Sequence, residues 1–398
     1  MAAWRRLYIM SKTCLMLVAG ERSGEIYGAE LATALRARLG EVEIFGCGGE
    51  AMRRAGVATT VDAHTITMVG ITEVLSGLPR VYRAFQTLLA EVDRRRPQLA
   101  VLIDFPDFNL RLAKKLRERN VRVVYYVSPQ VWAWRRGRLR QLKERIDQML
   151  CLFDFEEEIY QKAGIPVEHV GHPLVDMVRP HLSREDFFAK AGLDPQTATV
   201  ALLPGSRQKE VLYNLPPMLD AATRLAISRP IQFVVAVAPT LDPTWLESLV
   251  AQCYVGRAKV RTVANATYDA LQHGDVAVVA SGTATVEATL RERPFVVVYR
   301  VSPLTWLVGK FLVDVPYYSM VNLLAGKALI TELIQNDFTA PKVASQVEYL
   351  LDHPEARERI VDGLRAVKAR LGPGGATGRA ADAVVRLLGE SGATRRTA

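Results

Sequence analysis

Short runs of consecutive apolar residues recur along the chain, each followed by a polar or glycine-rich turn and then by a helical pattern. Runs this short and this rich in β-branched residues are typical of strands covered on both faces of a parallel sheet. The clearest run, Val276–Ala280, leads through a Ser-Gly-Thr turn into a helix that we expect to open at Ala284. The other predicted strands are residues 14–20, 42–47, 99–103, 121–127, 149–153, 167–171, 200–203, 231–238, 259–263 and 295–299.

The alternation of strands and helices lapses between residues 172 and 199 and then starts again. Gly20 and Gly205 stand at matching places, each just after the first strand of its half. An alternating pattern predicts an α/β fold with parallel, doubly wound sheets. We therefore expect two Rossmann-like domains, residues 1–172 and 173–372, with an inter-domain cleft where the carboxyl ends of the strands hold ligands.

Composition indicates a globular protein with anionic partners. The 398 residues are 49% hydrophobic and 23% charged, and the net charge is +9, which favours phosphorylated substrates, acidic lipid headgroups or nucleic acid. The four cysteines form no CxxC pair and no zinc spacing, as expected of a cytoplasmic enzyme. No apolar stretch is long enough to span a bilayer, the start of the chain lacks the pattern of a signal peptide, and Met10 is an alternative start.

The turn after Val276–Ala280 is a candidate anion site. A helix that begins directly after a buried strand points its unpaired N–H groups and the positive end of its dipole at the carboxyl edge of the sheet, where phosphate binds. Glu287, about one turn into the helix, could accept hydrogen bonds from sugar hydroxyls. The alternative is an ordinary turn in which Ser281 is the N-cap and Glu287 its capping-box partner.

Acidic and basic candidates follow two other strands. Asp104 and Asp107 lie on a proline-containing turn after strand 99–103, where a carboxylate is well placed to be a general base; alternatively, either one caps the next helix. Arg207 follows Gly205 and Ser206 and could clamp a phosphate, unless it is an ordinary surface arginine. Metal-binding motifs and the GxGxxG dinucleotide fingerprint are missing from the sequence, so we expect no metal and no cofactor.

Two further stretches each fit more than one role. Residues 68–78 are largely apolar and precede Arg80 and Arg83, which fits either buried core or a patch that enters a membrane or holds an acyl chain. Residues 128–136 combine two tryptophans with a basic run. Nucleic-acid stacking would need such residues, but no RNA-binding pattern accompanies them. A loop at the cleft edge or facing a membrane fits them better, and we expect no nucleic-acid partner.

Seven motifs in order resemble those of the lipid-A-disaccharide synthases, over roughly residues 14–371. One such motif alone would be weak, whereas their order is specific. Arg22 and Glu25 depart from the small residue and the aspartate usual in the first motif. The motifs are 18–25 (VAGERSGE), 68–75 (MVGITEVL), 104–109 (DFPDFN), 126–135 (YVSPQVWAWR), 202–207 (LLPGSR), 280–287 (ASGTATVE) and 322–326 (NLLAG).

The resemblance implies an inverting hexosyltransferase of the two-domain GT-B fold. Such an enzyme moves 2,3-diacylglucosamine from UDP to 2,3-diacylglucosamine 1-phosphate and releases UDP with the β-1,6 disaccharide precursor of lipid A. It is peripheral on the cytoplasmic face of the inner membrane of a Gram-negative bacterium, next to anionic lipids. In this fold the last helix, here 373–398, packs back on the first domain. The sequence does not determine the oligomeric state, and a homodimer is among the states that it allows.

Carried over by motif, Asp107 resembles the essential aspartate of the family and Arg207 its essential arginine, and we expect both to be catalytic. We expect the other site residues to bind the acceptor or the UDP group. They are Gly20, Ser23, Gly24, Asp104, Gly205, Ser206, Ser281, Gly282, Thr283, Glu287, Asn322, Glu332 and Gln335.

Two alternatives stay open from the sequence. Another UDP-N-acetylglucosamine enzyme of the same architecture, either a peptidoglycan transferase or an epimerase, would share the fold and the anion site. A non-catalytic two-domain protein that closes on an anion would share the cleft.

Overall fold

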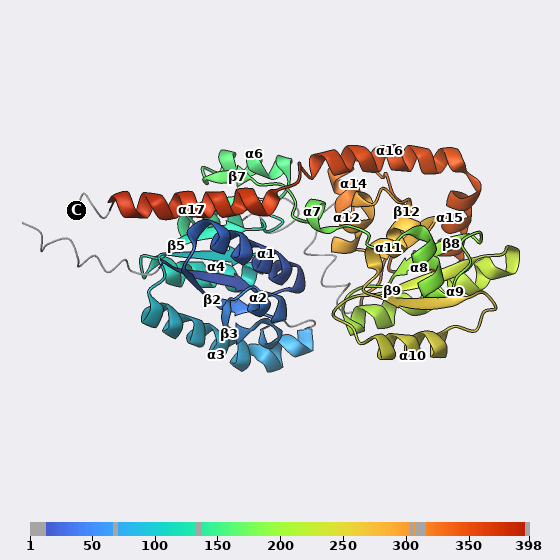
Figure 1. The fold of residues 1–398 in the computed structure, drawn as a ribbon, viewed down its shortest axis with the longest axis horizontal. Helices are drawn as coiled ribbons and strands as arrows, with labels where there is room; N and C mark the ends of the chain where they lie inside the picture. Colours follow the sequence, from blue (N-terminus) through green and yellow to red (C-terminus); the bar gives the residue numbers. More distant parts are fainter. Residues whose placement is uncertain (1–12, 67–70, 132–136, 303–305, 307–315, 395–398) are drawn as a thin grey trace, which may run out of the picture. The chain divides into compact units, whose positions relative to one another are not determined.

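The computed structural model describes residues 13–66, 71–131, 137–302, 306 and 316–394 (Figure 1). The chain forms two compact units, which are described separately. Unit 1 comprises Met1–Pro173 and Gly372–Ala398, and unit 2 comprises Leu174–Leu371.

The described part of unit 1 is built on a seven-stranded parallel sheet with the order β3-β2-β1-β4-β5-β6-β7. Figure 1 shows helices on both faces of this sheet. The strands are β1 (Thr13–Ala19), β2 (Val42–Gly48), β3 (Ala58–Asp62), β4 (Leu99–Ile103), β5 (Arg122–Tyr126), β6 (Gln148–Cys151) and β7 (Val167–His169). The helices are α1 (Arg22–Leu39), α2 (Glu50–Arg54), η1 (Ala63–Thr65), α3 (Ile71–Arg95), α4 (Pro106–Arg117), α5 (Arg138–Arg145), α6 (Asp154–Lys162) and α17 (Ala376–Thr394).

Unit 2 repeats this plan with a six-stranded parallel sheet in its described part, in the order β10-β9-β8-β11-β12-β13. The strands are β8 (Thr199–Leu203), β9 (Gln232–Val237), β10 (Val260–Ala264), β11 (Val276–Ala280), β12 (Phe295–Tyr299) and β13 (Glu332–Ile334). The helices are α7 (Leu174–Met177), α8 (Arg184–Ala191), α9 (Gln208–Ser228), α10 (Pro243–Cys253), α11 (Thr267–His273), α12 (Thr283–Leu290), α14 (Met320–Ala325), α15 (Ala340–Asp352) and α16 (Pro354–Arg370).

Burial explains why the central strands form. All five residues of β4, β8 and β11 are buried, so each of these strands removes apolar surface from water on both faces of its sheet. Cys14 and Cys151 are buried in the hydrophobic core of unit 1. The α/β fold class with parallel, doubly wound sheets is therefore confirmed.

Each sheet has a switch point. There, two neighbouring strands are followed by connections that lead to opposite edges of the sheet. In unit 1 it lies between β1 and β4, and Ala19 pairs with Ile103 there. In unit 2 it lies between β8 and β11, and Leu203 pairs with Val279. Ligands of open α/β sheets bind at this place, outside the carboxyl ends of the strands. The turns that follow these four strands are therefore the first places to look for a site.

The last helix, α17, packs along α1 within unit 1 (Figure 1). Arg38 of α1 forms an ion pair with Asp382 at 2.6 Å, and Arg386 pairs with Glu168. The buried face of α17 is rich in alanine, which allows close approach of the two helices.

Some elements could not be read from the strand and helix patterns of the sequence. Residues 340–371 form two helices, α15 and α16, because the His353–Pro354 step interrupts the pattern. The short strands β3 and β13 were not predicted. Among the described helices, none has the length and apolar character needed to cross a bilayer.

Candidate active site

The turn after β4 in unit 1 has an unusual backbone. Asp104 and Phe105 both have φ of 48°, a left-handed conformation that costs a non-glycine residue about 1–3 kcal/mol. Hydrogen bonds hold this turn: the Asp104 carbonyl accepts from Asn109 Nδ2 at 2.7 Å and from the Tyr125 hydroxyl at 2.6 Å. Pro106 then begins α4. The strained turn is thus fixed from two elements, and with it the direction in which the Asp104 side chain leaves the strand.

The two aspartates of this turn lie in different surroundings. Asp104 is half-buried, and burial together with the negative charge of Glu21 raises its pKa to about 7, against the opposing effects of the Phe105 N–H and Arg138. Asp107 is 67% exposed at its side chain and forms an ion pair with the buried Arg138 at 2.6 Å. A base for neutral pH needs a pKa near 7 and a free lone pair. Asp104 is therefore a candidate base beside Asp107, and the catalytic role of either aspartate stays a prediction.

The alternative that either aspartate caps α4 is wrong. The N-cap position is held by Phe105, and Asp107 lies inside the first turn of the helix. Arg138 is a residue of this turn's surroundings that the sequence analysis did not identify. Its partner lies 31 positions away, so no local pattern could have revealed the pair.

The first loop of unit 1 is shaped by close contacts. A Cβ atom on Gly20 would lie 2.4 Å from the Phe105 ring, so only glycine leaves room for that ring. Gly24 packs against the Ile103 side chain. Glu25 is buried and accepts a hydrogen bond from the Ala51 N–H at 2.7 Å, at the start of α2.

Glu25 also pairs with Arg22, at 3.0 Å. The two unusual residues of this motif are therefore partners, since Arg22 offsets the charge of the longer acid. Ser23 is half-buried beside them on the first turn of α1, and its role in binding stays a prediction.

In unit 2, the loop between β8 and α9 presents Arg207. Gly205 has φ of 128°, and the Ser206 N–H donates to the Glu210 carboxylate at 3.0 Å. The buried Asn214 holds the loop from below, because its Nδ2 donates to the Pro204 carbonyl at 3.0 Å. Arg207 is the N-cap of α9 and is exposed, so its guanidinium lies at the carboxyl edge of the sheet.

Among the described residues, no side chain caps the N-terminus of α12, as an anion site requires. Gly282, with φ of 146°, is the N-cap and provides no side chain, and Thr283 begins the helix on the exposed surface. Ser281 instead donates to the Tyr318 carbonyl at 3.0 Å. The alternative of a Ser281 cap with a Glu287 capping box is therefore wrong.

Glu287 lies on α12, one turn beyond this end. Burial raises its pKa to about 7, and within the described residues its carboxylate takes part in no hydrogen bond. The phenol of Tyr268 is near enough to feel its charge. Glu287 is half-buried, so its carboxylate is partly withdrawn from water, and hydroxyl groups of a ligand could bind it.

Asn322 and Glu332 are bonded to each other and to the surrounding backbone. Asn322 donates to Glu332 at 2.8 Å and exchanges two hydrogen bonds of 2.8 Å with the backbone of Ile330. Glu332 accepts from the N–H groups of Tyr318 and Ser319 at 2.8 and 2.9 Å. Both side chains thus fix the segment that Ser281 contacts, and direct binding of UDP by them stays a prediction.

Gln335 has a similar role in the neighbouring loop. Its backbone has φ of 52°, and its side chain pairs with both backbone groups of Val301, at 2.8 and 3.1 Å. Next to it, the Arg300 N–H donates to Asn214 at 3.0 Å, which links this loop to the one before α9. Contact of Gln335 with a nucleotide also stays a prediction.

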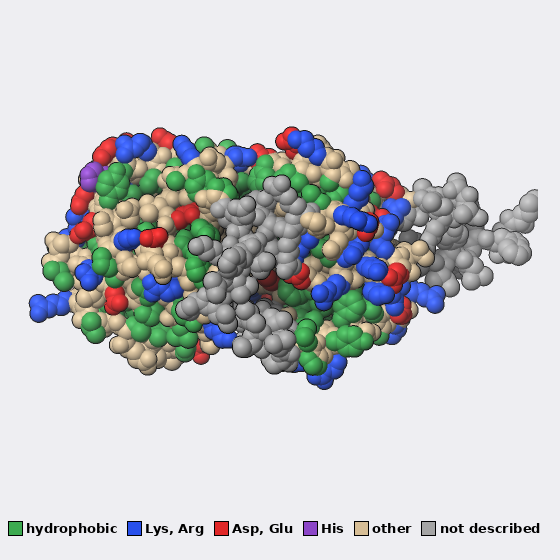
Figure 2. All heavy atoms as spheres, turned by 180° about the vertical axis from the view of Figure 1, so that it is seen from behind, with side chains coloured by type: hydrophobic (Ala, Val, Ile, Leu, Met, Phe, Trp, Pro, Cys, Tyr) green, Lys and Arg blue, Asp and Glu red, His purple; other side chains and the backbone are tan. Residues whose placement is uncertain are grey.

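The apolar stretch 68–78 lies mostly outside the residues whose side chains the structure describes, and so do Trp132 and Trp134. The described part of α3 has a buried face, with Leu88 and Val92, and exposed Leu78 and Tyr82 at its start. In Figure 2, basic and apolar side chains lie next to one another on the side of unit 1.

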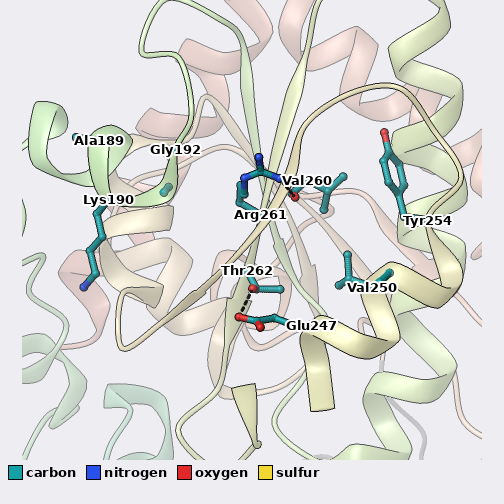
Figure 3. Close-up of a pocket in the computed structure, with 11 residues that line it drawn as sticks. Ala189, Lys190, Gly192, Glu247, Val250, Tyr254, Val260, Arg261 and Thr262 are labelled. Atoms are coloured by element: carbon teal, nitrogen blue, oxygen red, sulfur yellow. Dashed lines mark hydrogen bonds between the residues drawn. The ribbon is translucent and has the colours of Figure 1, made fainter. Parts of the chain in front are cut away.

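An open pocket of about 610 Å³ lies between α8, α10 and β10 (Figure 3). It contains none of the predicted site residues. Lys190, Glu247 and Arg261 supply its charges, and Glu247 accepts a hydrogen bond from Thr262 at 3.1 Å. This pocket is therefore separate from the turns at the switch point.

Comparisons with known proteins agree with the motifs. The sequence model described as lipid-A-disaccharide synthetase matches residues 15–379. A lipid-A-disaccharide synthase of Solibacter usitatus is 42% identical over 94% of this chain and 97% of its own length, and one of Koribacter versatilis is 45% identical with the same coverage.

Solved structures share the fold at low identity. The UDP-GlcNAc 2-epimerase of Neisseria meningitidis bound to UDP-GlcNAc has a TM-score of 0.63 at 11% identity, covering 94% of this chain and 100% of its own. The calicheamicin glycosyltransferase CalG4 has a TM-score of 0.60 at 15% identity, covering 95% and 99%. These likenesses identify the fold as that of GT-B glycosyltransferases and epimerases. The sequence matches distinguish between the families that share this fold, and they show that the chain belongs to the lipid-A-disaccharide synthase family of glycosyltransferases.

Proposed function

We propose that the chain transfers 2,3-diacylglucosamine from its UDP donor to 2,3-diacylglucosamine 1-phosphate, giving the β-1,6-linked lipid A disaccharide 1-phosphate and UDP. Membership of the family supports this reaction. The observation that carries the proposal is the N-terminus of α12, which no described side chain caps. One turn behind it lies Glu287, whose carboxylate makes no hydrogen bond among the described residues. This pair offers one binding group for a diphosphate and another for sugar hydroxyls.

Unit 2 binds the donor in this proposal. The N–H groups at the start of α12 and the helix dipole hold the diphosphate, while Glu287 accepts from hydroxyls of the nucleotide. Arg207 reaches the diphosphate from the neighbouring turn, because β8 and β11 are paired strands. Its positive charge offsets the negative charge that grows on UDP as the bond to the sugar breaks.

Unit 1 prepares the acceptor. Asp104 removes the proton of the attacking hydroxyl, the freed electron pair forms a bond to the anomeric carbon, and the bond from that carbon to the diphosphate breaks and leaves its pair on UDP. Attack from the face opposite UDP inverts the configuration. We assign the base to Asp104, because its half-buried carboxyl group has a pKa raised to about 7, whereas the exposed Asp107 carboxylate is ion-paired with Arg138. The Asp107–Arg138 pair then places a positive charge beside the base.

We also propose that the protein is peripheral on the cytoplasmic face of the inner membrane, where the acylated substrates are found. Leu78 and Tyr82 are 50% and 64% exposed on α3, next to Arg80 and Arg83, a combination that suits an anionic lipid surface. Replacement of Leu78 and Tyr82 by aspartate should reduce sedimentation with anionic vesicles at low salt. Ile227→Asp, a change at an exposed residue of unit 2, should not reduce it. If the wild-type protein sedimented equally with neutral and with anionic vesicles, a role of the arginines would be contradicted.

The reaction is tested by UDP release. Purified protein should release UDP from UDP-2,3-diacylglucosamine only when 2,3-diacylglucosamine 1-phosphate is present. UDP-N-acetylglucosamine without acyl chains should give no comparable rate. Release from the unacylated donor, or its conversion to an epimer, would favour the other UDP-sugar enzymes. Binding of UDP without release from any donor would favour a non-catalytic protein.

A further inference from the structure

Three helices that follow strands at the carboxyl edges differ in what occupies their N-termini. At α2 the carboxylate of Glu25 accepts from the Ala51 N–H. At α9 the carboxylate of Glu210 accepts from the Ser206 N–H. At α12 the N-cap Gly282 brings no side chain. Two of these helix starts thus carry an acid of the chain itself, and the third has no side-chain cap among the described residues.

Glu210 and the glycine of its loop fit one another closely. Gly205 has φ of 128°, and a Cβ atom placed on it would lie 2.4 Å from the Glu210 carboxyl carbon. The loop therefore closes directly over the carboxylate. Ser206 is held on its other side by a hydrogen bond from the Thr240 hydroxyl to its carbonyl, so the loop has little freedom while Glu210 is in place.

The charge of Glu210 also matters for its neighbours. Burial raises the pKa of the Glu210 carboxyl, whereas the backbone N–H groups of Ser206 and Arg207 and the charge of Arg207 lower it. These donors and this cation all belong to the segment that presents Arg207. The carboxylate is thus an internal counter-ion for the loop that is expected to meet the diphosphate.

We propose that Glu210 is a positioning residue: its carboxylate fills the anion position of α9, excludes phosphate from it, and holds the loop so that Arg207 meets the diphosphate bound at α12. The proposal rests on the proposed function. The paired strands β8 and β11 bring the two turns side by side, with Leu203 opposite Val279. With Glu210 at the start of α9, the N-terminus of α12 is the one of these two neighbouring helix ends that is left for the diphosphate.

The first test separates turnover from binding. Glu210→Gln should lower kcat by about 30-fold, because Arg207 acts mainly on charge that develops in the transition state. The Kd of UDP, measured by calorimetry, should change by less than about threefold. Asp269→Asn is the matched control, because Asp269 is a buried acid that accepts two backbone N–H bonds of 2.7 Å elsewhere in unit 2. It should lower stability while kcat is retained.

Turnover of Glu210→Gln within threefold of the wild type would overturn the role of Glu210, and so would parallel losses of kcat and UDP affinity, which indicate a general loss of structure. A wild type that releases no UDP from any donor would overturn the proposed function, and this inference with it. If the wild type is active and the Glu210→Gln variant is equally active, only this inference is overturned.

A double-mutant cycle gives a second, independent test. Gly205→Ala adds a Cβ atom where the Glu210 carboxylate lies, and its backbone strain is the same whether or not that carboxylate is present. Gly205→Ala should therefore reduce kcat about tenfold more in the wild type than in the Glu210→Ala background. Equal reductions in both backgrounds would mean that the carboxylate does not shape the loop, which would overturn the proposal.

Discussion

The carboxyl edges of the two units are built on the same kind of parallel sheet. The turns after β4, β8 and β11 nevertheless differ in which residues have positive φ. After β4 in unit 1, positive φ values fall on two residues with side chains, Asp104 and Phe105. After β8 and β11 in unit 2, they fall on Gly205 and Gly282. Strain on a non-glycine residue persists only where the surrounding structure enforces it. The turn after β4 therefore retains a side chain at the strained point, whereas the turns after β8 and β11 expose their main chain.

This difference matches the chemistry proposed for each unit. A proton acceptor has to be a side chain with a tuned pKa, and burial supplies this for Asp104. A diphosphate is bound well by main-chain N–H groups and a cation, which Gly282 and Arg207 allow. The same topology thus carries a base in one unit and an anion site in the other.

The largest effect should come from removing the base. Asp104→Asn should reduce kcat/KM by about 10³-fold, since general-base catalysis contributes about 10²–10⁴-fold. Asp107→Asn should reduce it by only about tenfold, because it disturbs the charge of Arg138 and leaves the base in place. Steady-state kinetics give kcat/KM for the two variants, and circular dichroism checks that both are folded. A larger loss in Asp107→Asn would return the role of base to Asp107.

A smaller effect is expected on the anion side. Arg207→Ala should reduce kcat by about 10²-fold, comparable with the loss of one donor to a developing negative charge. Arg207→Lys should recover part of this, because it keeps the charge and loses the planar fork. Lys209→Ala is the control, since Lys209 is an exposed cation two residues away. If the two alanine variants lose the same activity, the general positive potential of the loop and not Arg207 is responsible.

The sequence was sufficient for the central strands. Residues 99–103, 276–280 and 295–299 form strands with the predicted bounds, because each is an unbroken apolar run that is buried on both sides. The strands β3 and β13 escaped prediction. They lie at the ends of their sheets, and only one residue of each is buried, so they lack the apolar run on which such predictions depend.

The site could be predicted only in part, for a related reason. Positions directly after buried strands follow from the local pattern, and this is why Asp104, Arg207 and Glu287 were candidates. The choice between Asp104 and Asp107 depended on a left-handed turn and on Arg138, neither of which a local pattern reveals. The internal carboxylate Glu210 was also missed, although an acid at the third helical position is a known capping signal.

The pH dependence should report the environment of Asp104. The base works only when deprotonated, and its pKa is about 7. The kcat/KM should therefore rise about tenfold per pH unit below 7 and level off above it. In Asp104→Asn the residual rate should lack this limb, whereas Asp107→Asn should keep it. A limb near pH 4 in the wild type would mean that the acting base is an ordinary exposed carboxylate.

The smallest effect concerns stability, and it contrasts two acids of unit 2. The pKa of Glu287 in the folded protein, about 7, lies above its ordinary value of 4.5, so the folded state binds this proton more tightly than the unfolded state. Stability is then lost as pH rises from about 4.5 to 7. Glu287→Gln should consequently raise the free energy of unfolding at pH 8 by about 1 kcal/mol and leave it nearly unchanged at pH 4.

At pH 8, Glu332→Gln should change the stability in the opposite direction to Glu287→Gln. The Glu332 carboxylate accepts from the backbone of Tyr318 and Ser319, from the Ser319 hydroxyl and from Asn322, and an amide cannot accept all four hydrogen bonds. This change should lower the melting temperature where Glu287→Gln raises it. Glu287→Gln should also weaken UDP binding, because the acid that destabilises the empty protein is the one that the nucleotide hydroxyls satisfy. Stabilisation without weaker UDP binding would separate the burial of Glu287 from any role in the donor site.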